Sequence, residues 1–195
     1  APACTALPAA ERGLDLDVPS AEVGPVTSRV DELESQGWSF EAADASFELL
    51  LRHEVDEVPP APPCQLESYR VIVDHATGGE VVAQATVTVH VAGKRVIATA
   101  EGNGPVNALD GALRQALGAH LPWLENVELS DYKVRILPGT HGTDAVTRVL
   151  VDTSDGTGSW TTVGVHGNVV EASWLALLDA MIYASLRHHG VASTA

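Results

Sequence analysis

The sequence contains an internal repeat, and this repeat restricts the possible folds more strongly than any other feature of the chain. Ser68-Tyr69-Arg70-Val71 matches Asp131-Tyr132-Lys133-Val134, which begins 63 residues later. Val106-Asn107-Ala108 matches Val170-Glu171-Ala172, which begins 64 residues later. Because the two pairs agree in order and in spacing, we interpret them as the duplication of one structural unit.

Each copy of the repeat predicts three strands followed by a helix. Runs rich in β-branched residues predict strands at 69–73, 85–91 and 95–100, and again at 132–136, 145–152 and 160–165. Helices are expected at 106–117 and 169–186, and the second is apolar nearly all round, which is typical of a buried helix. The expected fold is therefore α+β, a duplicated βββα unit with pseudo-two-fold symmetry. Two small sheets leave faces and edges that a second chain would cover.

A helical segment precedes the repeat. Apolar residues at helical spacing predict one helix that Gly37 ends and a second that begins near Ser39. The proline-rich run at 58–63 ends the second helix, because proline cannot continue the helical hydrogen bonds. We therefore expect a linker at 1–20 that is disordered, a two-helix communication segment at 21–63, the duplicated domain at 64–188, and a tail at 189–195.

Charge and cysteine content argue against several classes of partner. The 195 residues carry 26 acidic and 11 basic side chains, a net charge of −15, which disfavours nucleic acid and anionic membrane surfaces. No apolar run is expected to approach the roughly 20 residues of a membrane-spanning helix. Cys4 and Cys64 do not form a disulfide framework, which favours a reducing cytoplasm.

The loop Gly102-Asn103-Gly104-Pro105 is the first candidate binding site, since it lies between a predicted strand and a predicted helix. The first turn of a helix offers unpaired backbone N–H groups, and glycine lets a ligand approach them closely, so the loop suits a carboxylate. The alternative is a tight turn that needs glycine only for its dihedral angles. A dinucleotide site is poorly supported, because the third glycine of that motif is missing.

Other residues that suggest chemistry have simpler explanations. His188 and His189 are adjacent on a helix and point about 100° apart, so they do not readily bind one metal ion. Ser173 has no partner histidine and acid in the order of a known catalytic triad. The sequence therefore predicts no catalytic residue and no metal site in this chain.

Four stretches carry a resemblance to a known family. The stretch 34–50 resembles the segment just before the regulatory domain of citramalate synthases, and 100–109 resembles the first ligand loop of that domain. The stretches 160–165 and 168–174 resemble its second ligand loop. Over roughly residues 11–188 the chain is similar to the C-terminal regulatory part of the family of 2-isopropylmalate, homocitrate and citramalate synthases.

The resemblance implies a regulatory role within an acyltransferase. The family's enzymes condense acetyl-CoA with a 2-oxo acid in an N-terminal TIM barrel that holds a divalent metal, and pyruvate gives citramalate on a path to isoleucine. This chain has no His-x-His pair and is shorter than a barrel of about 250 residues, so we expect it to be inactive alone and to need no cofactor. The regulatory domain is expected to form a homodimer, to bind a branched-chain amino acid for feedback inhibition, and to act on an upstream barrel.

Two alternatives stay open. One is a regulatory domain of 2-isopropylmalate synthase that responds to leucine, and the other is a stand-alone domain that binds a small ligand without a catalytic role. By resemblance the effector-binding residues are Gly102, Asn103, Gly104, Pro105, Val106, Leu129, Tyr132, Ile136, Val146, His166 and Asn168. His166 departs from the pattern, because family members often carry another residue there.

Overall fold

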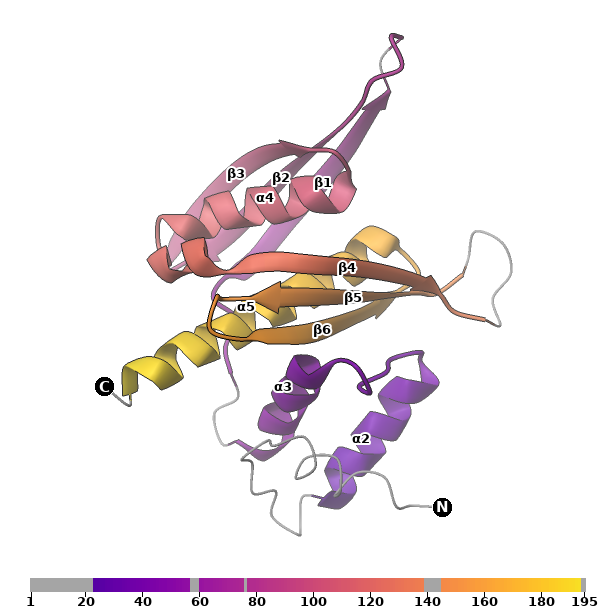
Figure 1. The fold of residues 1–195 in the computed structure, drawn as a ribbon, viewed down its shortest axis with the longest axis vertical. Coiled ribbons are helices and arrows are strands. Elements are labelled where there is room, and N and C mark those ends of the chain that lie inside the picture. The colour runs from indigo at the N-terminus through magenta and orange to yellow at the C-terminus, as the bar shows by residue number, and fades with distance from the viewer. Residues whose placement is uncertain (1–22, 57–59, 76, 139–144, 194–195) are drawn as a thin grey trace. The chain divides into compact units, whose positions relative to one another are not determined.

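The computed structural model describes residues 23–56, 60–75, 77–138 and 145–193. It confirms the predicted α+β class and the duplicated βββα unit (Figure 1). Each copy forms a three-stranded antiparallel sheet, ordered β1-β2-β3 and β4-β5-β6, and a helix follows each sheet. The predicted linker at 1–20 lies outside the described residues.

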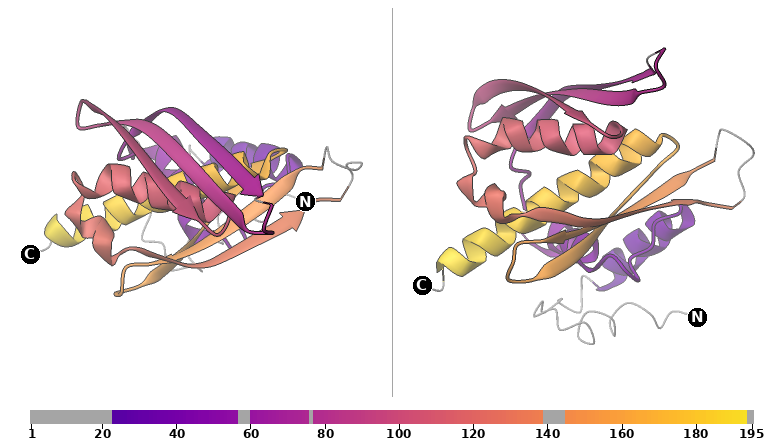
Figure 2. Two further views of the ribbon diagram at one scale, coloured as in Figure 1. Left: turned by 90° about the horizontal axis from the view of Figure 1, so that it is seen from above. Right: turned by 45° about the horizontal axis from the view of Figure 1, so that its top comes forward.

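The first copy comprises β1 (Gln65–His75), β2 (Val81–Val91), β3 (Lys94–Gly102) and α4 (Pro105–Gly118). Alternate residues of β2 are buried on the face that α4 covers, and they are Ala83, Ala85, Val87, Val89 and Val91. Figure 2 shows α4 lying along this face. Ala92 and Gly93 join β2 to β3 with φ angles of 49° and 76°, the positive pair that a two-residue hairpin turn requires.

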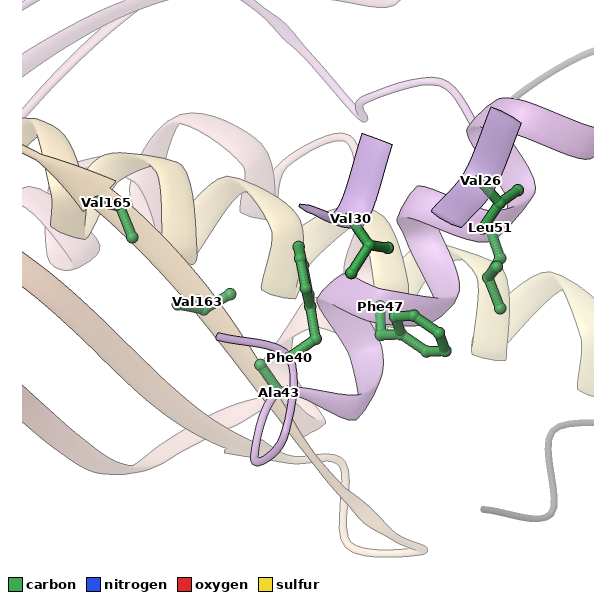
Figure 3. Close-up of a cluster of buried hydrophobic side chains, with 8 residues drawn as sticks. All are labelled: Val26, Val30, Phe40, Ala43, Phe47, Leu51, Val163 and Val165. Carbon is green, nitrogen blue, oxygen red and sulfur yellow. The ribbon is translucent and has the colours of Figure 1, made fainter. Parts of the chain in front are cut away.

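The second copy comprises β4 (Glu128–Ile136), β5 (Thr147–Ser154), β6 (Ser159–His166) and α5 (Val169–Ser193). Alternation along β6 directs its side chains to two different layers. Thr162 Oγ1 donates a hydrogen bond to the backbone oxygen of Ala176 in α5, at 2.8 Å. Val163 and Val165 point the other way, into a core that they share with the helical segment (Figure 3).

That helical segment comprises α2 (Val23–Ser35) and α3 (Asp44–Val55). Val26 and Val30 of α2 and Phe47 and Leu51 of α3 are buried in the core shared with β6. The sheet β4-β5-β6 therefore lies between α5 on one face and α2 and α3 on the other (Figure 1).

Gly37 ends the first helix as predicted. The backbone N–H of Trp38 donates to the oxygen of Leu33 at 3.1 Å, and that of Gly37 donates to Glu34 at 3.0 Å. This is the Schellman pattern, and it requires the positive φ of 104° that Gly37 adopts. The second helix begins at Asp44 rather than near Ser39, because the chain first makes a turn that buries Phe40.

The chain forms two compact units, and each combines segments that are separate in the sequence. One unit comprises the described residues of the first 61 positions and of Asp131–Asp152, together with Trp160–Tyr183, so the helical segment packs with the second sheet. The other unit comprises Pro62–Ser130, Thr153–Ser159 and Ala184–Ala195. Helix α5 continues to Ser193 and so includes most of the segment expected to be a tail.

The expectation about long apolar runs was wrong for α5. By length and composition alone its residues Val169–His189 could cross a membrane, with a mean hydropathy of 1.5. In the fold, however, Ala172, Ala176 and Ala180 are buried, and Ser173 and Thr162 join α5 to the sheet by hydrogen bonds. These features are those of a core helix.

Candidate functional site

The junction between β3 and α4 carries the first group of predicted site residues. Gly102 ends β3, Gly104 is the N-cap of α4, and Pro105 and Val106 open the helix. A Cβ atom on Gly102 would lie 2.6 Å from the backbone nitrogen of Ala108, so only glycine allows the helix to start this close to the strand. Asn103 donates its backbone N–H to the side-chain oxygen of Asn107, at 3.3 Å.

Helix α4 begins without a side-chain cap. Gly104 has no side chain to offer, and a Cβ atom placed on it would meet no atom within 4 Å. Open space therefore adjoins the end of the helix where backbone N–H groups lack intrahelical acceptors and the helix dipole is positive. Gly104 has a φ of −167°, an extended conformation open to any residue, so a tight turn with positive φ does not explain this glycine.

The second predicted loop is arranged differently. Asn168 stands where the repeat places Gly104, and its side-chain oxygen accepts hydrogen bonds from the N–H groups of Val170 at 2.8 Å and Glu171 at 3.4 Å. Nδ1 of His166 accepts the N–H of Asn168 at 2.9 Å, although His166 itself is exposed. Helix α5 is thus capped by the protein's own side chain, whereas α4 is left open.

Tyr132 faces α5. Its hydroxyl lies 2.8 Å from the hydroxyl of Ser173, and Ser173 donates its own proton to the backbone oxygen of Val169 at 2.6 Å. The Tyr132 hydroxyl must therefore donate to Ser173. Burial raises the pKa of Tyr132, so the phenol stays protonated and keeps this role at neutral pH.

The apolar residues predicted to contact the effector side chain do not all lie on one face of the second sheet. Ile136, 69% exposed, shares the Tyr132 face of β4 because the two are four residues apart in one strand. Val146 packs instead against the core made with α2 and α3, on the opposite face of this sheet. Within this chain Val146 thus lies apart from Tyr132 and Ile136, and its part in an effector wall stays a prediction.

The remaining predicted residues fall in different units. Gly102 to Val106 and the partly buried Leu129 belong to the unit that contains the first sheet, whereas Tyr132, Ile136, His166 and Asn168 belong to the other. The assembly of both groups into a single effector site stays a prediction. Among the described residues, no group of three or more His, Cys, Asp or Glu side chains could hold a metal ion.

Sequence reasoning missed a polar contact that joins α3 to α5. The hydroxyl of Ser46 donates to Asp179 at 2.7 Å and accepts the backbone N–H of Val163 at 3.0 Å. Burial raises the pKa of Asp179 to about 6, although the Ser46 hydrogen bond acts in the opposite direction. One signal could have revealed this contact, because Asp179 is the single charged residue between positions 172 and 186 of a strongly apolar helix.

Comparison with known proteins places the chain among regulatory domains of one enzyme family. A family model described as the LeuA allosteric (dimerisation) domain matches residues 41–185. The chain is 54% identical over 177 residues to the (R)-citramalate synthase of Streptomyces coelicolor, covering 91% of this chain and 33% of that protein. It is 45% identical over 175 residues to the (R)-citramalate synthase of Synechocystis sp., covering 88% of this chain and 32% of that protein.

A 2-isopropylmalate synthase from Solidesulfovibrio magneticus is also similar. It is 35% identical over 107 residues, which cover 55% of this chain and 19% of that protein. The chain thus spans about a third of the length of the citramalate synthases that it matches. Because the family model matches well over half of the chain, this protein belongs to the LeuA allosteric (dimerisation) domain family.

Proposed function

We propose that this chain is the regulatory and dimerising part of a citramalate synthase-like acyltransferase, which condenses acetyl-CoA with pyruvate in isoleucine biosynthesis in the cytoplasm. The names and identities of the relatives support this assignment, since (R)-citramalate synthases from several bacteria are 41–54% identical to this chain. The catalytic work belongs to a TIM barrel and its divalent metal, and this chain contributes neither catalytic residue nor cofactor.

The proposed ligand is a branched-chain amino acid, isoleucine first and leucine second. Its carboxylate would accept hydrogen bonds from the N–H groups that open α4, and Leu129, Tyr132 and Ile136 would contact its side chain. The observation that carries the proposal is the uncapped start of α4 beside the open space at Gly104. The positive end of a helix dipole stabilises a negative group by about 0.3–1 kcal/mol at an exposed site, and direct N–H donors add to this.

The alternative assignment is the regulatory domain of a 2-isopropylmalate synthase that responds to leucine. The match to the Solidesulfovibrio magneticus enzyme supports it, but that match covers a smaller part of the chain than the citramalate synthases do. A pocket that discriminates by one methyl position provides only about 1–3 kcal/mol, so the two amino acids should differ by roughly 10- to 200-fold.

Calorimetric titration with isoleucine, leucine and valine tests the proposal. Gly104→Val should abolish measurable binding, because its side chain would occupy the space beside the first turn of α4. The backbone of Gly104 is extended, so the variant should fold, and circular dichroism checks this. Gly78→Val is a matched control, since Gly78 is exposed in the β1–β2 turn with no atom within 4 Å of its Cβ position. Absence of binding to folded wild-type protein at millimolar concentrations would refute the effector role.

A further inference from the structure

A pocket of about 320 Å³ lies in the unit formed by α2, α3, the second sheet and the first part of α5. This volume is at the lower end of the range for small-molecule sites. Its walls are largely apolar and come from α2, α3 and α5 and the turn between the first two. It contains none of the residues predicted to bind the effector.

Among the described residues, the acidic groups that line this pocket are Asp179 and Glu54, and the Glu54 side chain is 28% exposed. Asp179 receives one hydrogen bond, from the Ser46 hydroxyl at 2.7 Å. Within the described residues, no basic side chain pairs with Asp179. A carboxylate that is largely withdrawn from water and held by a single neutral donor favours a cationic partner, because the desolvation cost of its charge is not offset.

The basic side chains of the lining do not supply that partner. Arg29 pairs with Glu32, with 2.6 Å between the guanidinium nitrogen and the carboxylate oxygen, and its side chain is 44% exposed. His53 is 71% exposed and lies 3.8 Å from Glu54. Both therefore belong to the solvent-exposed edge of the pocket, and the interior is left with a negative group.

Two aromatic rings form part of the wall. Trp38 and Phe40 stack with their centroids 6.2 Å apart and their planes inclined by 19°. Both line the pocket, together with Leu33, Leu49, Leu50 and Ile182. Figure 3 shows Phe40 in the core beside Val30 and Phe47. The two rings therefore offer an apolar surface that suits the hydrocarbon part of a ligand whose charged group contacts Asp179.

We propose that this pocket binds a small organic ammonium ion, whose charged nitrogen contacts Asp179 and whose hydrocarbon part lies against Trp38 and Phe40. The site is separate from the proposed effector loop and does not depend on it. A free amine and an amino acid share the ammonium group, but the carboxylate of an amino acid would lie close to Asp179 and Glu54. The simple amine is therefore the preferred ligand.

Calorimetry on the full 195-residue chain with 3-methylbutylamine tests this site. At pH 7.5 we expect saturable binding, with the uncharged isostere 3-methylbutanol and leucine each at least about tenfold weaker. Asp179→Asn should weaken amine binding by at least about tenfold. Gly104→Val should leave it unchanged, which separates this site from the effector loop.

The pH dependence provides a second readout in the wild-type protein. Because burial raises the pKa of Asp179 to about 6, roughly a tenth of this group is ionised at pH 5, and amine binding should weaken by about tenfold there. Arg29 of α2 and His53 and Glu54 of α3 also line the pocket. His53→Gln controls for histidine protonation and should keep both the affinity and its pH dependence.

Three results would overturn the proposal. They are no binding of the amine at 10 mM, equal binding of 3-methylbutanol, or unchanged binding in folded Asp179→Asn protein. Leucine that binds as tightly as the amine and loses its affinity in Asp179→Asn would overturn the assigned ligand class. If Asp179→Asn does not fold, the alcohol comparison and the pH dependence of the wild type decide the question.

Discussion

At the scale of single residues, the buried carboxyl of Asp179 should make stability depend on pH in an unusual direction. Its pKa in the folded protein is about 6, higher than the ordinary 3.8, so the folded state holds a proton that the unfolded chain has lost. The free energy of unfolding should therefore fall as pH rises from about 4 to about 6 and stay low above that range. Full ionisation of Asp179 should therefore lower the free energy of unfolding by about 1–3 kcal/mol.

Asp179→Asn should remove this cost. The amide oxygen can still accept the Ser46 hydrogen bond, so the variant should be more stable than the wild type at pH 7.5 by about 1–3 kcal/mol. The difference should vanish only below about pH 3, where the wild-type carboxyl is mostly neutral in both states. Urea unfolding across this pH range measures it, with Asp31→Asn on the exposed side of α2 as the control. A variant that is less stable at pH 7.5 would contradict the account.

Gly164 allows α5 to lie against β6. A Cβ atom on Gly164 would overlap the backbone oxygen of Ala172 and lie 2.9 Å from the nitrogen of Ala176. Helix backbone cannot move aside locally, so Gly164→Ala should destabilise the fold by at least about 1–3 kcal/mol. Gly167→Ala, with no atom within 4 Å of its Cβ position, should change stability by less than about 0.5 kcal/mol. Equal thermal unfolding of the two variants would refute this reason for the glycine.

At the scale of elements, Ser46 attaches α3 to the sheet and to α5. Ser46→Ala would leave the buried N–H of Val163 without its acceptor, and such a group costs about 1–3 kcal/mol. The exposed hydroxyl of Ser35, which donates to the backbone of Glu32, offers a matched control, and Ser35→Ala should be nearly neutral. Chemical denaturation compares the two, and hydrogen exchange at Val163 should accelerate only in Ser46→Ala. Equal effects would mean that Ser46 does not hold the helix.

The elements themselves were largely predictable from sequence, because alternation, helical spacing and the Gly37 stop are local signals. Strand lengths were underestimated, since β1 extends from Gln65 to His75 along its partner β2. The sequence did not show on which face of the sheet Val146 lies, nor that Ser46 is the hydrogen-bond partner of Asp179. Both depend on which helices cover the sheet. The sequence Gly104-Pro105 indicated that α4 begins without a side-chain cap, because glycine has no side chain. It did not indicate that Gly104 would adopt an extended φ.

At the scale of the whole molecule, the compact units cut across the order of the chain. The helical segment shares a core with the second sheet, through Phe40 and Phe47 on one side and Val163 and Val165 on the other. A segment that precedes the duplicated domain in sequence is therefore part of the packing of its second copy. The two units divide at Ala61 and Pro62, within the proline run, but the helical segment joins the later sheet and not the strands that follow the run directly.

The sequence repeat also indicates which surface of the chain forms the dimer. Val73 of β1 and Ile136 of β4 are 63 residues apart, at equivalent positions of the two copies, and they are 51% and 69% exposed. Both strands lie at an edge of their sheet. Exposed apolar side chains on unpaired edge strands favour association, and the family is named for dimerisation. We expect both positions to be covered by a second copy of the chain.

Sedimentation equilibrium should give twice the chain mass of 20.4 kDa for the wild type at micromolar concentration. Val73→Lys and Ile136→Lys should each raise the dissociation constant of the dimer by about tenfold or more. The reason is that burying an unpaired ammonium group in the interface is costly. Gln84→Lys, at an exposed position of the central strand β2, should leave the dimer intact. A wild-type monomer would exclude dimerisation through this chain alone, and a dimer insensitive to both edge substitutions would place the interface on another surface.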